Sequence, residues 1–336
     1  MRRRIRPLPR FGSRPIETRI NSQAMRIPLP AAVLLTLFCA GLAISGRPSS
    51  AQSAPAAASS SAMESVAIYV TPVSKKGVPA DLKPGDLTIT EDKVPAKIEK
   101  INCGKPEPLL LGLLLDVSAS RRRDPLLLSH YEALHAFVNQ ALTGDDAAYL
   151  VDFSDTLVRL GEVTSNRAAI SAAFGELRRD LPRSSTSMYD AIEFTLKGDP
   201  GRSAHRVLVV IGDWEDNSSH IGLEDAVEIA QRHSTAVYAI VDATDNPTYT
   251  KTAYKRSLSA AKKATEETGG RYFDVHGEKE FDAALQAIQV ATGGSCRVEY
   301  SVPNTAGTNR GIKLRVDVHA KDISISYPRV RFSAAP

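Results

Sequence analysis

Three oxygen-bearing side chains follow a strongly apolar run in the first half of the chain. The run LLLGLLL (109–115) leads into Asp116, Ser118 and Ser120. Alternate residues of an extended chain point the same way, so these side chains are expected to lie together, with Asp116 exposed at a strand end. A carboxylate and two hydroxyls are hard oxygen ligands, which suit Mg²⁺ or Mn²⁺ but fill only part of an octahedron. The stretch therefore predicts part of a divalent-metal site.

Two later segments offer further oxygen ligands. RSSTSMYDAI (183–192) places Thr186 just before a helical stretch, and VLVVIGD (207–213) ends in Asp213. A second carboxylate helps to balance the charge of a divalent ion. The combined set still leaves a position on the ion for a ligand from outside the protein.

The elements that would position these segments are strands that alternate with helices between residues 108 and 292. Strand-like runs lie at 109–116, 147–153, 207–213, 236–242 and 271–275. Apolar residues spaced by three and four indicate helices between them, as at Leu127, Tyr131, Leu134, Val138 and Ala141. This alternation predicts an α/β fold, a doubly wound, mostly parallel, Rossmann-like sheet with helices on both faces. Such sheets bind ligands beyond the carboxyl ends of their strands, where Asp116 and Asp213 fall.

Short strand-like runs without helical period flank this part on both sides. Those before it lie at 66–73, 87–90 and 96–101, and those after it lie at 296–302, 311–318 and 330–332. Neither group is long enough to bury a core by itself. The N-terminal segment 63–104 and the C-terminal segment 295–336 are therefore expected to join in a flanking antiparallel β unit.

The segments DVSAS, STSMYDA and IGDWEDNSS, in this order and spacing, resemble the metal-ion-dependent adhesion site of von Willebrand factor A (VWFA) domains. The resemblance covers about 108–292, and the flanks resemble those of secreted acidobacterial VWFA-related proteins. It implies Mg²⁺ or Mn²⁺ bound, directly or through water, by Asp116, Ser118, Ser120, Thr186 and Asp213. The function it implies is adhesion or binding without catalysis, in which the ion grips an acidic side chain of a protein or matrix partner.

Residues beside the first and third segments set the expected rim of the site. Gly212 stands where the family commonly has Ser or Thr, and Trp214 stands where it commonly has Gly. Neither replaces a ligand, but Trp214 is expected to line or crowd the rim. Arg121 is assigned to the rim as well. With Arg122 and Arg123 it is either solvated surface or a source of positive potential that favours an acidic partner.

The first 51 residues differ in composition from the rest of the chain. Arg26, the apolar run 27–45 and the small residues 49–51 are typical of a signal peptide, with Met25 as an alternative start and an uncleaved membrane anchor as the alternative role. The Ala/Ser/Pro segment 52–62 is typical of a linker. We therefore expect a protein that is secreted or held in the periplasm or cell envelope.

The charge balance does not support a nucleic-acid partner. The first 51 residues hold nine Arg and one Glu, so the formal net charge of +4 conceals a remainder of 33 basic and 37 acidic residues. That remainder gives no reason to expect the basic face that nucleic-acid binding requires. The chain also lacks a phosphate-binding glycine loop, so no nucleotide is expected.

Two other functions compete with metal-dependent binding. One is a structural scaffold whose metal site is vestigial. The other is a haloacid-dehalogenase-like phosphatase, which would use Asp116 as nucleophile but needs an acid two positions later, where this chain has Ser118. A zinc site in HYEALH is not expected, because His130 and His135 are five residues apart and point in different directions on a helix.

Cysteine usage predicts one covalent cross-link. After removal of a signal peptide, Cys103 and Cys296 remain of the three cysteines, and an even pair in an exported protein is more often bridged than free. Cys103 ends the leading strands and Cys296 begins the trailing ones, so a bond would tie the two flanks together. The alternative is two buried free thiols that pack as small apolar side chains.

Overall fold

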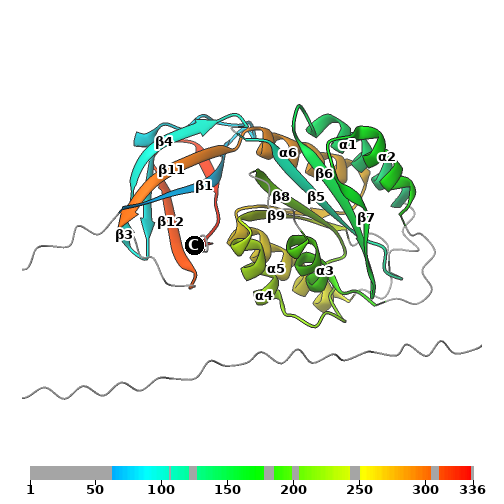
Figure 1. The fold of residues 1–336 in the computed structure, drawn as a ribbon. Coiled ribbons are helices and arrows are strands. Elements are labelled where there is room, and N and C mark those ends of the chain that lie inside the picture. Colours follow the sequence, from blue (N-terminus) through cyan, green and yellow to red (C-terminus); the bar gives the residue numbers. More distant parts are fainter. Residues whose placement is uncertain are drawn as a thin grey trace, which may run out of the picture. The chain divides into compact units, whose positions relative to one another are not determined.

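The computed structural model describes residues 63–105, 107–120, 127–177, 185–198, 204–242, 250–303 and 310–333, which belong to one compact unit of the chain (Figure 1). The predicted signal peptide, the linker and Arg121 to Arg123 lie outside these residues. Within them, none of the helices is long and apolar enough to cross a membrane.

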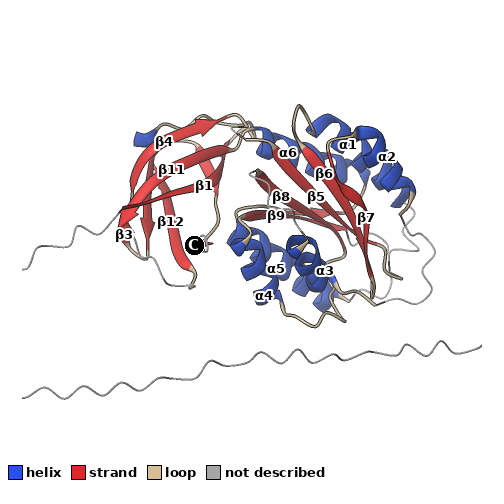
Figure 2. Cartoon of the chain, in the orientation of Figure 1, coloured by secondary structure: helices blue, strands red, loops and turns tan. Residues whose placement is uncertain are grey.

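A six-stranded sheet forms the centre of the α/β part, in the order β10-β9-β8-β5-β6-β7 (Figure 2). Its strands are β5 (Leu109–Asp116), β6 (Ala147–Phe153), β7 (Leu157–Thr164), β8 (His205–Gly212), β9 (Thr235–Asp242) and β10 (Tyr272–Val275). Neighbouring strands run parallel except for β7, which pairs antiparallel with β6 at one edge. Every residue of β5 is buried, because both of its faces are covered, and this explains its run of leucines.

Helices cover both faces of this sheet. One face packs against α1 (Leu127–Ala141), α2 (Arg167–Gly175) and α6 (Glu278–Gly293), and the other packs against α3 (Met188–Lys197), α4 (Leu223–Arg232) and α5 (Lys251–Thr268). Two apolar clusters result, one on each side of the leucines of β5. The predicted doubly wound α/β fold is confirmed.

The flanking strands form two antiparallel sheets around a third apolar cluster. One sheet has the order β13-β1-β11-β4 and the other β14-β12-β2-β3. Their bounds are β1 (Met63–Ser74), β2 (Leu87–Glu91), β3 (Val94–Pro95), β4 (Lys97–Cys103), β11 (Cys296–Pro303), β12 (Ile312–Val318), β13 (Ile323–Ser326) and β14 (Val330–Arg331), with a short 3-10 helix η1 (Pro84–Asp86) before β2. The N-terminal and C-terminal strands therefore join in one antiparallel β unit, as expected.

Cys103 and Cys296 are bonded to each other. They lie directly opposite in the ladder between β4 and β11, the strands that lead into and out of the α/β part. The bond closes a loop with a sequence separation of 193 residues. It therefore links the two chain segments that connect the β unit to the α/β part.

A buried ion pair within one sheet of the β unit, between Arg331 and Glu91, also contacts Glu64 and Tyr300 of the other sheet. The Arg331 guanidinium donates to both carboxylate oxygens of Glu91, at 2.5 and 2.7 Å, and to Glu64 at 3.2 and 3.3 Å. The Tyr300 hydroxyl donates to Glu91 at 2.6 Å. Burial, together with the hydrogen bond to the Glu91 carboxylate, raises the pKa of Tyr300. The Glu91 side chain is only 5% exposed, so it depends on these donors for its solvation.

Arg331→Met is expected to lower the free energy of unfolding by about 3 kcal/mol, because it leaves the Glu91 carboxylate buried without its cation. Arg315→Met is the matched control, since Arg315 pairs with Asp317 on the surface and such pairs contribute about 0–1 kcal/mol. Urea unfolding of both variants measures the difference. Equal stabilities of the two variants would show that the buried Arg331–Glu91 pair does not stabilise the β unit.

Candidate metal centre

Asp116 occupies the last position of β5 and lies below the surface. It is 3% exposed, so the expectation that it is solvent-exposed is wrong. One of its carboxylate oxygens, Oδ1, accepts the Ser118 backbone N–H at 2.8 Å, which turns the chain sharply after the strand. The Ser118 and Ser120 hydroxyl oxygens lie 3.0 Å apart. The first segment thus brings the two serine hydroxyls together, and the Asp116 carboxylate holds the backbone of the first serine.

Gly212 allows Asp116 to take this place. A β-carbon at residue 212 would lie 2.6 Å from the Asp116 β-carbon and 2.8 Å from its Oδ2 atom. Contacts this short do not occur between real side chains, so the Asp116 side chain lies directly over the backbone of the neighbouring strand β8. The lack of a side chain at Gly212 therefore lets Asp116 lie next to the residue that precedes Asp213.

Asp213 and Thr186 are joined through the loop after β8. Asp213 is 2% exposed, and its Oδ1 atom accepts the Glu215 N–H at 3.0 Å. The Thr186 N–H donates to the Asn217 side chain at 2.9 Å, and the Thr186 carbonyl accepts the N–H groups of Asn217 and Ser218 at 3.0 and 3.1 Å. The second and third segments therefore hold each other through backbone groups.

Polar side chains that the sequence analysis did not single out fix these loops. The Ser187 N–H donates to the Ser154 carbonyl at the end of β6, and the Ser187 and Ser218 hydroxyls are 2.8 Å apart. Asp216 accepts the Tyr189 N–H at the start of α3. The sequence feature that could have pointed to these residues is the polar run after β8. Its side chains at 216–219 form hydrogen bonds with the segment 186–190.

Asp190 has a structural role in the same region. Its carboxylate accepts the backbone N–H groups of His220 and Ile221, and the His220 ring lies 2.8 Å away. Burial by itself raises the pKa of Asp190, but these hydrogen bonds hold that pKa below its usual value. The residue thus fastens the loop after β8 to α3 and belongs to the support of the site.

The negative potential at this edge of the sheet affects a neighbouring acid. Burial, and after it the Asp213 carboxylate, raises the pKa of Glu215. Two buried aspartates at the carboxyl ends of β5 and β8 make the region favourable for a cation. All three motif segments thus fall at the carboxyl edge of one sheet.

Residues 109–293 form a doubly wound α/β domain around one six-stranded sheet. Solved structures similar to the chain include BatB from Bacteroides thetaiotaomicron, with 16% identity and a TM-score of 0.44 over 54% of this chain and 97% of that chain. They also include a von Willebrand factor type A structure from Catenulispora acidiphila, with 11% identity and a TM-score of 0.46 over 77% of this chain and 71% of that chain. A third is the manganese-loaded Plasmodium vivax TRAP protein, with 17% identity and a TM-score of 0.41 over 68% of this chain and 96% of that chain. Similarities this weak carry no information on ligand or partner. No family model and no curated protein sequence matches the chain.

The donor set at the carboxyl edge of this sheet suits a hard divalent ion. Two neighbouring ligands of an octahedral Mg²⁺, each at about 2.1 Å, lie about 3.0 Å apart. The Ser118 and Ser120 hydroxyl oxygens have this separation. Within the described residues, no cluster of three or more His, Cys, Asp or Glu side chains is arranged for a metal.

Trp214 does not line the rim of the site, contrary to expectation. Its backbone has φ 59°, and this left-handed conformation turns the side chain away from the carboxyl edge. The ring is 2% exposed in the apolar cluster beneath the sheet, and its N–H donates to the Val210 carbonyl at 3.3 Å. The backbone strain is offset by the burial of a large aromatic ring. Arg121, the other rim residue, lies outside the described residues.

The two histidines of HYEALH are in separate environments. His130 is buried, stacks on Phe281 at 4.0 Å, and has its Nδ1 atom 2.9 Å from the Asp242 carboxylate. His135 contacts the Ser171 hydroxyl at 2.7 Å. His130 is thus a core residue that supports the end of β9, and the two do not form a zinc pair.

Gly212→Ser, which restores the residue type common in the family, is expected to weaken Mn²⁺ binding by roughly tenfold, because the new side chain displaces the Asp116 carboxylate. Gly222→Ser is the control, since a β-carbon there has no neighbour closer than 3.6 Å. Isothermal titration calorimetry of the two variants measures the effect. Unchanged affinity in Gly212→Ser would mean that the position of Asp116 over this backbone is not needed for the ion.

Proposed function

We propose that this protein is an exported binding or adhesion module that holds Mg²⁺ or Mn²⁺ through Asp116, Ser118, Ser120, Thr186 and Asp213. The observation that carries the proposal is the pair of hydroxyl oxygens 3.0 Å apart beside a buried carboxylate that lies over Gly212, next to Asp213. Export rests on the signal-like front of the chain and on the Cys103–Cys296 bond, since such bonds persist in oxidising compartments.

The ion would serve as the contact point for a partner. Two carboxylates and three hydroxyls leave an octahedral ion with a further position, which a carboxylate of a protein or matrix partner fills well. Arg121 to Arg123 directly follow the first segment in sequence and would add positive potential for such a partner. The role is binding without catalysis, because Ser118 stands where a phosphatase of this motif type needs an acid.

We further propose the organisation of the whole chain. Residues 1–51 act as a signal peptide and 52–62 as a linker, and the β unit from 63–104 and 295–336 carries the metal-binding domain 108–292 between its two halves. The β unit would then hold the domain away from the point of export or attachment, with the carboxyl edge of the sheet available to a partner.

A pull-down from the envelope fraction and culture medium of the source organism tests the function. The immobilised protein should retain a partner with Mg²⁺ present, release it with EDTA and recover it when Mg²⁺ returns, whereas Asp116→Asn should retain none. Binding should also fall with salt more steeply in the wild type than in an Arg121/Arg122/Arg123→Ala variant, because salt screens exposed charges. A partner retained equally in EDTA would indicate a structural scaffold instead.

A further inference from the structure

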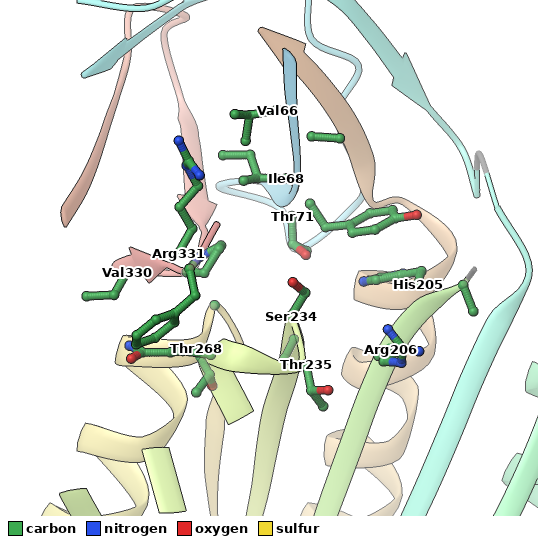
Figure 3. A pocket seen from close by; sticks show the side chains of 18 of the residues that line it. Val66, Ile68, Thr71, His205, Arg206, Ser234, Thr235, Thr268, Val330 and Arg331 are labelled. Atoms are coloured by element: carbon green, nitrogen blue, oxygen red, sulfur yellow. The ribbon is translucent and has the colours of Figure 1, made fainter. Parts of the chain in front are cut away.

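A second concave site lies at the opposite edge of the central sheet from the metal centre. A cavity of about 260 Å³ is bounded by β1 and by the residues at the amino-terminal starts of β8 and β9, among them His205 and Thr235 (Figure 3). Its remaining wall comes from the chain around β14, including Pro328 and Phe332. The cavity therefore lies where the β unit meets the α/β part, and none of the five proposed metal ligands lines it.

The cavity faces the edge of β1. Six consecutive residues, 64–69, line it, although alternate side chains of a strand point to opposite faces. A wall made of consecutive residues therefore presents the backbone. On one edge, β1 pairs with β11 from Met63 to Val70, but on the other it pairs with β13 only from Thr71 to Ser74. Beyond β13 the chain crosses to β14 in the other sheet, so among the described strands none pairs with this edge from residue 63 to 70.

The backbone groups on the uncovered edge can be assigned. In an antiparallel ladder the N–H and C=O of one residue point to the same side, and successive residues alternate. The Pro72 carbonyl accepts the Ala80 N–H on the β11 side, whereas the Lys75 N–H donates to Asp322 on the β13 side. Odd-numbered residues of β1 therefore face the uncovered edge. Ser65, Ala67 and Tyr69 present their backbone donors and acceptors to the cavity.

His205 supplies a further polar group from the opposite wall. It is 5% exposed, and its ring stacks on Tyr69 at 4.1 Å. Burial lowers the pKa of His205 to about 4, so its neutral ring has one donor and one acceptor at neutral pH. The cavity thus has groups that can form hydrogen bonds on two walls.

We propose that this cavity binds a short extended segment of a partner protein, which adds to the uncovered edge of β1 as a strand. Three residues that alternate along the edge, each with one donor and one acceptor, match the spacing of another main chain. A volume of about 260 Å³ is below that of pockets for drug-sized ligands, about 300–1,000 Å³, so the segment must carry small side chains such as Ala, Ser, Thr or Val. The site is independent of the metal centre and does not need the ion.

A phage-displayed library of random linear heptapeptides, selected on the full chain in EDTA, is the probe. Enriched peptides should be rich in small and β-branched residues, and a synthetic copy should bind in fluorescence anisotropy. Methylation of alternate backbone nitrogens in that peptide should weaken binding at least tenfold in one of the two registers, because the ladder hydrogen bonds are lost. This comparison leaves the protein unchanged, so misfolding of a variant cannot explain it.

Two variants locate the site. Ala67→Pro removes the central N–H of the uncovered edge at a position where an edge strand tolerates proline, and His205→Phe keeps the stacked ring but removes its nitrogens. Each should weaken peptide binding at least tenfold, whereas Asp116→Asn should bind like the wild type. Failure to enrich any peptide, or equal binding by both N-methylated registers and by the two variants, would overturn the proposal and leave the metal centre unaffected.

Discussion

Replacement of Asp116 by Asn is expected to weaken Mn²⁺ binding by roughly 100-fold or more, with little change in the fold. The ion would lose one of its two charged ligands. The amide oxygen of Asn has the same shape, so it still accepts the Ser118 N–H and still fits over the Gly212 backbone. Isothermal titration calorimetry measures the affinity, and thermal unfolding followed by circular dichroism checks the fold.

Asp155→Asn is the matched control for this experiment. It makes the same change of charge close to the end of β6, at an exposed residue that is not among the proposed ligands. This control should bind Mn²⁺ like the wild type. If Asp116→Asn bound the ion as tightly as Asp155→Asn, Asp116 would not be a ligand and the assignment of the site would fail.

The second large effect concerns the bond between Cys103 and Cys296. The double variant Cys103→Ser/Cys296→Ser is expected to lower the free energy of unfolding by up to about 5 kcal/mol. The reason is that a cross-link over a sequence separation of 193 residues strongly restricts the unfolded chain. In the folded protein the bond also fixes β4 to β11, where the chain enters and leaves the α/β part. Loss of that link should therefore lower the stability of both the β unit and the α/β part.

Guanidinium unfolding in the presence and absence of a reductant measures this stabilisation. The wild type should lose most of the difference when it is reduced, whereas the double Ser variant should not respond to reductant. A stability change below about 1 kcal/mol in both comparisons would show that the bond does not restrict the unfolded state as the loop length implies.

The central strands could be predicted because their sequence is determined by burial. β5 and β6 have the predicted bounds, since strands covered on both faces need apolar residues at nearly every position. β7 was not predicted, because it is a half-exposed edge strand whose sequence, LVRLGEVT, has neither an apolar run nor clean alternation. α2 and β13 are similarly short, and their few buried positions give little periodic signal.

The place of the proposed ligands in the fold could be predicted from the sequence, but the side chains that support them could not. The residues at strand ends follow directly from the motif and the topology, whereas the burial of Asp116 depends on a glycine in a neighbouring strand. Trp214 was misplaced because its position in sequence, one residue after a predicted ligand, says nothing about a positive φ. Side-chain direction at such a residue depends on the backbone conformation, which a single sequence does not reveal.

A crystal structure of the protein grown with Mn²⁺, with anomalous data collected at the manganese absorption edge, would locate the ion directly. We expect one strong anomalous peak at the carboxyl edge of the sheet. It should lie about 2.0–2.3 Å from oxygens of Ser118 and Ser120, with Asp116, Thr186 and Asp213 as direct or water-mediated ligands. A fully ordered site without such a peak, or a manganese ion bound elsewhere in the chain, would contradict the proposed metal site.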